Sequence, residues 1–170
     1  MTEANEASRP MLLVTWRMLT IMLTALSLGP ALGHLLELPA KMLYDGRLWL
    51  RVSQTLYSTF GTVGAAFEVS AVVTAVFLAF LVRRRQLAFG WTMLGATCLV
   101  ASHAAFWIWI APVNAIIAVA TGDTLPADWM ELRKQWEYTH AARAILQTIA
   151  LATLVFSVVI ESSLADSKER

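Results

Sequence analysis

The chain has 170 residues and a net charge of +1, and 58% of its residues are hydrophobic while only 15% are charged. A soluble domain carries roughly 25% charged residues, so this composition excludes an ordinary soluble enzyme, a disordered chain and a nucleic-acid-binding protein. The single cysteine, Cys98, excludes an intrachain disulfide and a cysteine-based zinc finger. The composition indicates an integral membrane protein with room for about four spans of roughly 20 residues.

Four apolar stretches follow one another along the chain, at residues 11–38, 55–82, 87–110 and 138–160. Backbone polar groups in lipid must pair within the segment, so each stretch is predicted to form a helix. We read the first as a retained span and not a signal peptide, because its leader contains Glu3 and Glu6. Pro112 is expected to break the third. The sequence therefore predicts an all-α fold, a membrane four-helix bundle with a single domain over residues 1–170.

Charged and aromatic residues outside the apolar stretches predict the orientation. Residues 83–85 are three consecutive arginines, and the positive-inside rule places this turn, and with it both termini, in the cytoplasm. On the opposite side, residues 41–57 have the apolar spacing of an interfacial helix. Trp129 and Trp136 are expected to flank the boundary between water and lipid. We expect a bacterial plasma-membrane protein in contact with the lipid bilayer, either alone, as a homo-oligomer or in a larger membrane complex.

Several ionisable residues lie inside these stretches or at their edges. Placing such a residue in a span costs roughly 2.5–3.5 kcal/mol on insertion scales, which makes each a candidate for function. The set consists of His34, Glu37, Glu68, His103, Glu137, His140 and Arg143. In the predicted topology most of them fall in the outer half of one bundle.

The spacing of these residues predicts a metal site. Glu137 and His140 are separated by three positions and share a helix face, as in the Glu-x-x-His unit of di-iron bundles, and His34 and Glu37 repeat this spacing in reverse. The predicted ligands are His34, Glu37, Glu68, His103, Glu137 and His140. This mixture suits iron, zinc, manganese or copper. Alternatively, two of the histidines bind haem.

Structural alternatives remain for the two most ambiguous carboxylates. Glu137 would pair with Lys134 or Arg133 in the headgroup layer, and Glu68 would form an ion pair with Arg143. On the second span, a polar and glycine stripe would let a ligand approach closely. Its members are Gln54, Tyr57, Gly61, Gly64 and Glu68.

Three runs of residues resemble a known family. They are Gly33 to Met42 at the end of the first span, Trp107 to Asn114 with its Pro-x-Asn, and Trp136-Glu137-x-x-His140-x-x-Arg143. In this order they resemble the small four-span membrane family that includes fungal anthrone oxygenases and many bacterial proteins. The resemblance implies oxygen-dependent oxidation of an anthrone-like polyphenol to a quinone.

We therefore expect a membrane oxidoreductase that acts on a hydrophobic aromatic small molecule. A histidine such as His140 suits proton abstraction, because its pKa lies close to the working pH. Arg143 and Asn114 would stabilise the developing oxyanion, and Glu68 would assist. Two alternatives remain open: a haem-binding electron-transfer protein, and a non-enzymatic accessory subunit or carrier in which the ionisable groups hold the helices together.

Overall fold

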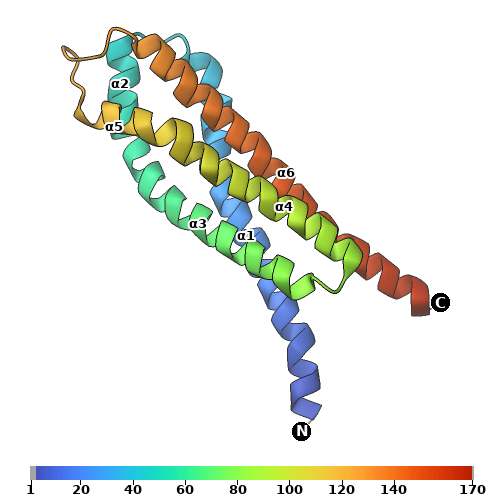
Figure 1. The fold of residues 1–170 in the computed structure, drawn as a ribbon. Coiled ribbons are helices and arrows are strands. Elements are labelled where there is room, and N and C mark those ends of the chain that lie inside the picture. Colours follow the sequence, from blue (N-terminus) through green and yellow to red (C-terminus); the bar gives the residue numbers. More distant parts are fainter. Residues whose placement is uncertain (1–2, 170) are drawn as a thin grey trace.

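The computed structural model describes the backbone of residues 3–169 and the side chains of residues 11–57 and 59–163. The regular secondary structure of the described residues is all-α, as predicted. In chain order it contains the α-helices α1 (Glu3–Lys41), α2 (Gly46–Thr55), α3 (Tyr57–Val82) and α4 (Gln86–Ala105), the π-helix η1 (Phe106–Ile110), and the α-helices α5 (Ala111–Val119) and α6 (Trp129–Glu169). Figure 1 shows them as one elongated bundle.

Four segments are long and apolar enough to cross a membrane, which confirms the predicted number of spans. They are Met11–Lys41, Thr59–Val82, Gln86–Val119 and Trp129–Ser163. Helix α1 packs against α3 and α6, and α4 packs against α3 and α6, so the four spans form a closed ring. In Figure 1 the start of α1 and the last part of α6 lie at the same end of the bundle. Helix α2 lies at the opposite end, here called the α2 end. The cytoplasmic location of the termini stays a prediction.

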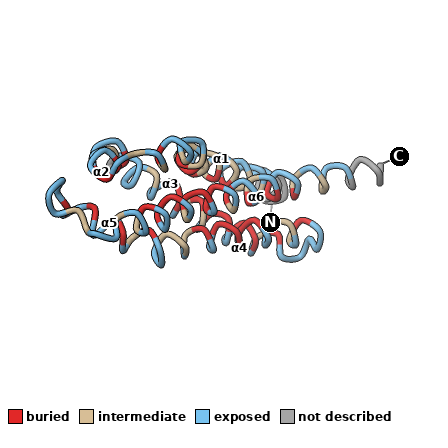
Figure 2. The backbone as a smooth tube through the Cα atoms, turned by 90° about the horizontal axis from the view of Figure 1, so that it is seen from above, coloured by how far each residue is buried: buried red, intermediate tan, exposed pale blue. Residues whose placement is uncertain are grey.

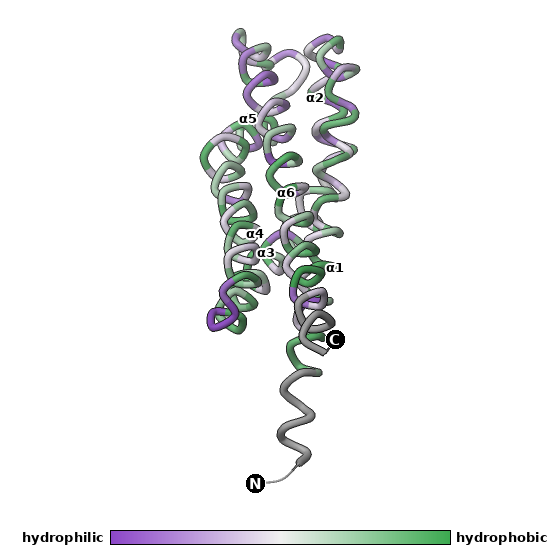
Figure 3. The backbone as a smooth tube through the Cα atoms, turned by 90° about the vertical axis from the view of Figure 1, so that its right-hand side faces the viewer, coloured by the Kyte–Doolittle hydropathy of each residue, from purple (hydrophilic) through white to green (hydrophobic). Residues whose placement is uncertain are grey.

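Hydropathy along the bundle agrees with a spanning orientation. In Figure 3 the most hydrophilic segments lie at the α2 end and at the turn between α3 and α4, and hydrophobic residues occupy the length between them. Figure 2 shows buried residues on the inward sides of the helices, while much of the outer surface is exposed. Because the exposed outer surface of the spans is mostly apolar, it is suited to contact lipid acyl chains.

The third span continues through Pro112, which was predicted to end it near residue 110. A proline lacks an N–H and its ring clashes with the carbonyl four residues earlier. Here the five residues before Ala111 form a π-helical turn, in which the Ala111 N–H bonds to the Phe106 carbonyl. This wider turn accommodates the proline. The Gln135 side chain donates to the Trp109 carbonyl at 2.8 Å, so α6 satisfies a backbone acceptor of this turn.

The predicted interfacial segment contains a true helix, α2. Asp45 caps it, because its carboxylate accepts the Leu48 backbone N–H at 2.8 Å. Its Trp49 and Leu50 are buried against α5 and α6. Helix α2 therefore closes the bundle at this end and holds the start of α3 in place.

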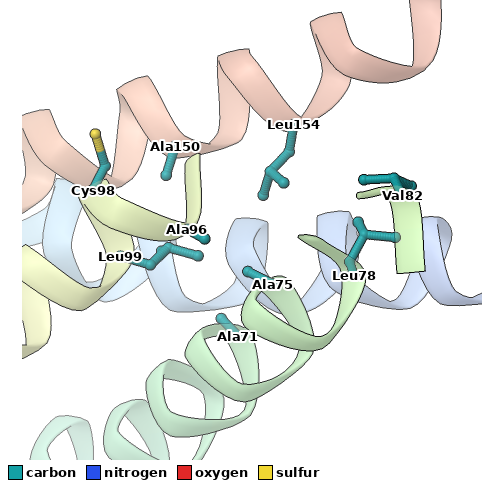
Figure 4. Close-up of a cluster of buried hydrophobic side chains, with 9 residues drawn as sticks. All are labelled: Ala71, Ala75, Leu78, Val82, Ala96, Cys98, Leu99, Ala150 and Leu154. Atoms are coloured by element: carbon teal, nitrogen blue, oxygen red, sulfur yellow. The ribbon is translucent and has the colours of Figure 1, made fainter. Parts of the chain in front are cut away.

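The core near the arginine turn is made of small and aliphatic side chains. Figure 4 shows nine of them, from α3, α4 and α6: Ala71, Ala75, Leu78, Val82, Ala96, Cys98, Leu99, Ala150 and Leu154. Beyond this core, Glu161 accepts hydrogen bonds from Arg17 and Arg85 and so ties α1, α6 and the turn together. Arg17, which lies inside the first apolar stretch, is held in this ion-pair cluster.

Helices α4 and α6 approach each other closely at Gly95. A Cβ atom there would lie 2.9 Å from Thr153 Oγ1, 3.0 Å from Leu154 Cγ and 3.2 Å from the Ala150 carbonyl oxygen. We expect Gly95→Val to lower the free energy of unfolding by about 1–3 kcal/mol through overpacking. Gly90→Val is the matched control, since a Cβ at Gly90 has no neighbour within 4 Å. Thermal unfolding in detergent measures both variants, and equal midpoints would contradict this account of the contact.

Candidate functional site

A cavity of about 530 Å³ lies in the half of the bundle near α2. Ligand cavities for drug-sized molecules cover roughly 300–1,000 Å³. All five members of the predicted stripe on α2 and α3 line it. Its other polar lining residues are Ser27, His34, Ser53, Thr62, His103, Asn114, Trp136, His140, Arg143 and Gln147. The tertiary structure therefore brings most of the predicted site residues to one cavity.

One wall of the cavity reaches the outer surface of the bundle between α3 and the η1–α5 segment. On α3, the lining residues Gly61, Ala65 and Val69 are exposed. On the other side, the lining residue Trp107 is 62% exposed. These positions belong to spanning segments, so the surface around the opening faces lipid.

Two histidine rings from different helices contact each other at the cavity wall. The rings of His34 and His140 have centroids 4.1 Å apart. Trp136 lies 4.2 Å from His140 and 5.0 Å from His34, centroid to centroid, and Tyr57 lies 4.4 Å from His34. The aromatic neighbours fix both rings in place, so their nitrogen atoms have defined directions.

The hydrogen-bond partners of these two rings determine their tautomers. The Nδ1 atom of His140 lies 2.8 Å from the Trp136 carbonyl oxygen, which can only accept, so Nδ1 carries the proton. The Nδ1 atom of His34 lies 3.1 Å from the Lys41 ammonium, which can only donate, so here Nδ1 has the lone pair. In the neutral rings, Nε2 of His140 is then an acceptor and Nε2 of His34 a donor. Both histidines line the cavity.

The third histidine belongs to a second group of polar side chains. The Trp107 indole N–H donates to Nε2 of His103 at 3.0 Å, so the ring proton lies on Nδ1, which is 3.5 Å from Oε1 of Glu68. The other carboxylate oxygen of Glu68 accepts from Arg143 at 2.5 Å. Arg143 also donates to the Ser102 carbonyl at 3.1 Å. The predicted alternative, an ion pair between Glu68 and Arg143, is confirmed.

Asn114 and Gln147 complete the polar part of the wall. The carbonyl oxygen of the Asn114 side chain accepts the Trp136 indole N–H at 2.8 Å, which leaves its amide nitrogen as a donor toward the cavity that it lines. Gln147 donates to the Ser102 hydroxyl at 3.2 Å and accepts from Ser27 at 3.4 Å. Polar groups from α1, α4, α5 and α6 therefore meet at this cavity, although most of its lining surface is apolar.

The remaining predicted ligands lie behind the histidine pair and do not line the cavity. Glu137 is fully buried, and its carboxylate lies 2.6 Å from the ammonium of Lys41. This excludes the expected pairing with Lys134 or Arg133, since Lys134 pairs with Glu131 and Arg133 donates to backbone carbonyls.

Glu37 lies nearer the surface than Glu137. It accepts a hydrogen bond from the Tyr57 hydroxyl, and its side chain is 46% exposed. Burial and this hydrogen bond to Glu37 raise the pKa of Tyr57 above its usual value, so Tyr57 acts as a neutral donor.

The predicted metal ligands are divided between the histidine pair, the group that contains His103 and Glu68, and the two carboxylates behind the pair. Among the described side chains, no three His, Cys, Asp or Glu residues lie together as a metal ion requires. Each carboxylate already has a partner: Glu37 accepts a hydrogen bond from Tyr57, Glu68 pairs with Arg143, and Glu137 forms an ion pair with Lys41. This arrangement does not fit a shared metal site. The haem alternative stays a prediction. If His34 and His140 were the two axial ligands, they would have to separate, because their direct contact leaves no room for a macrocycle between them.

Sequence reasoning missed two residues of this site. Lys41 was placed in an outer connection, yet its side chain is 2% exposed. Trp136 was expected at the lipid boundary, yet it is 3% exposed and touches both histidines. Its position one residue before Glu137, on the face that carries His140 one turn later, was the available signal.

No protein-family model matches the chain, and neither the curated proteins nor the solved structures include a similar one. The comparisons therefore identify no family for this four-span membrane protein, and the resemblance to anthrone oxygenases stays a hypothesis.

Proposed function

We propose that the protein is a membrane-embedded oxidoreductase that deprotonates a hydrophobic aromatic substrate, of the anthrone class, for reaction with oxygen. The observation that carries this proposal is the pair of contacting imidazoles at the wall of an apolar cavity, one an acceptor at Nε2 and the other a donor. An acceptor and a donor side by side are the two groups needed to remove a proton next to a carbonyl.

The roles of the residues follow from their hydrogen bonds. His140 takes the substrate proton at Nε2, because its Nδ1–H is held by the Trp136 carbonyl. His34 donates its Nε2–H to the substrate oxygen on which negative charge develops, and the amide nitrogen of Asn114 adds a second donor. Arg143 contributes positive charge, although Glu68 already neutralises much of it. Glu68 acts through Arg143 and His103.

The reaction balances with molecular oxygen as the oxidant. Loss of one C–H proton to His140 leaves a substrate carbanion, which reacts with oxygen to give a hydroperoxide after the proton returns. Loss of water from the hydroperoxide gives the quinone. Anthrone and one oxygen molecule thus give anthraquinone and one water molecule. The substrate class is taken from the resemblance to anthrone oxygenases, and the lipid-facing opening and the cavity volume support a hydrophobic ligand of this size.

The experiment compares vesicles that contain the purified protein with protein-free vesicles of the same lipid. Anthrone is added, and oxygen uptake and anthraquinone absorbance are recorded together. We expect the protein to accelerate both, with one oxygen molecule consumed for each anthraquinone molecule formed. Rates equal to those of protein-free vesicles would overturn the proposed reaction.

Narrowing the lipid-facing opening tests the route of entry. A Cβ atom at Gly61 has no neighbour within 4 Å, so Gly61→Phe should fold normally while its ring reduces access from the bilayer. We expect kcat/KM for anthrone to fall by roughly tenfold, the scale of a steric misfit in an apolar site. Gly33→Phe is the matched control, because Gly33 has equal space but does not line the cavity. Equal losses in both variants would contradict this route.

A further inference from the structure

The buried ion pair of Lys41 and Glu137 stands directly behind the histidine pair. Both side chains are enclosed, at 2% and 0% exposure, and their charged atoms are 2.6 Å apart. Taking two charges out of water is costly, and replacing such a pair with apolar residues is often neutral or stabilising. A buried pair at this position therefore calls for a role other than stability.

The contacts of Lys41 show what it acts on. Its ammonium reaches Glu137 on α6, the Nδ1 atom of His34 at 3.1 Å, and Glu37 at 3.9 Å. It also lies 5.0 Å from the ring centroid of Tyr57 and 5.2 Å from that of Trp136. Two aromatic faces and two carboxylates surround the ammonium. An ammonium presents N–H donors and no acceptor to His34.

We propose that Lys41, held by Glu137, is a positioning residue that fixes His34 as the Nε2–H tautomer and so makes the two imidazoles unequal. With Nδ1 of His34 occupied, the ring has only its Nε2–H to offer to the cavity. His140 has the opposite tautomer because the Trp136 carbonyl holds its Nδ1–H. The two imidazoles thus supply one donor and one acceptor at the same wall of the cavity.

The other charged and titratable groups around His34 do not replace Lys41 in this role. Glu37 bonds to Tyr57, and Arg143 bonds to Glu68 and to the Ser102 carbonyl. His103 faces Glu68 and accepts from Trp107. Among the described residues, Lys41 is the hydrogen-bond partner of Nδ1 in His34. The use of the two rings in a reaction rests on the proposed function, but the assignment of their tautomers does not.

Nitrogen NMR of the protein labelled with ¹⁵N-histidine reads the tautomers without any substrate. The three histidines give six side-chain signals, which the His34→Gln and His103→Gln variants assign. We expect a lone-pair signal for Nδ1 and a protonated signal for Nε2 in His34, and the reverse in His140. A wild-type spectrum with Nδ1–H in His34 would overturn the proposal, whatever the variants do.

The double variant Lys41→Met/Glu137→Gln removes both charges together and so leaves no unpaired buried ion. We expect the two nitrogen signals of His34 to move toward each other as its tautomers mix, while the signals of His140 stay unchanged. The control is Lys134→Met/Glu131→Gln, which removes an exposed ion pair from α6, the helix that carries Glu137. Signals of His34 that are identical in the double variant and the wild type would overturn the role of Lys41.

Turnover of anthrone by the double variant separates this inference from the proposed function. We expect kcat to fall about tenfold with little change in KM, since the lost donor acts on the transition state. Wild-type protein with the expected tautomers but no turnover would overturn the proposed function and leave the role of Lys41 intact. Full turnover by a double variant with mixed tautomers would overturn the functional part of this inference.

Discussion

Replacing His140 with glutamine is expected to lower the turnover of anthrone by about 10²–10⁴-fold, the usual contribution of a general base. The imidazole is held by the Trp136 carbonyl at Nδ1 and presents the lone pair of Nε2. Glutamine has a similar reach and polarity, but its amide does not take up a proton at neutral pH. Oxygen uptake by vesicles that contain the variant measures the loss.

The controls for His140→Gln separate loss of the base from loss of the fold. Tyr138→Phe alters an exposed side chain on the same helix and should keep the full rate. His103→Gln should lose less than His140→Gln, because Nε2 of His103 already accepts from Trp107. If His103→Gln loses more than His140→Gln while both variants remain folded, the base is assigned to the wrong histidine.

Replacing Glu68 with leucine is expected to lower the free energy of unfolding by about 3–5 kcal/mol, because it leaves a buried charge on Arg143 without its partner. The side chains of Glu68 and Arg143 are 9% and 7% exposed, and their charged atoms are 2.5 Å apart. The double variant Glu68→Leu/Arg143→Met removes both charges, so it should recover most of the lost stability. Unfolding in detergent, followed by tryptophan fluorescence, gives the three values.

An exposed ion pair provides the comparison for this experiment. Arg47 and Asp123 lie 3.0 Å apart with 74% and 89% of their side chains exposed. Asp123→Ala should therefore change the free energy of unfolding by less than about 1 kcal/mol. A double variant at Glu68 and Arg143 that is as unstable as Glu68→Leu alone would contradict the explanation by an unpaired buried charge.

Local sequence patterns determined the architecture of this protein. Four apolar stretches define four spanning helices, because a backbone in lipid must satisfy its own hydrogen bonds and hydropathy is a property of each segment by itself. Helical spacing also grouped residues correctly along α2 and the start of α3. The stripe from Gln54 to Glu68 lines the cavity throughout, because residues three and four positions apart share a face.

Only the tertiary structure decided which residues from different helices are partners. Glu137 had Lys134 and Arg133 as near neighbours in sequence, yet it pairs with Lys41 from α1. The rotation of α6 against α1 sets this choice, and spacing along one helix carries no information on it. The structure likewise divided the six predicted metal ligands between separate hydrogen-bonded or ion-paired groups.

The three histidines show the same contrast between what the sequence determined and what the tertiary structure decided. The sequence by itself placed His34, His103 and His140 inside or beside the spans, where an ionisable residue is a candidate for function. The tertiary structure decided which nitrogen of each ring carries the proton, because that depends on whether the nearest partner is a carbonyl, an ammonium or an indole N–H. Hydropathy identified the helices, and contacts between helices determined the chemistry that each histidine offers.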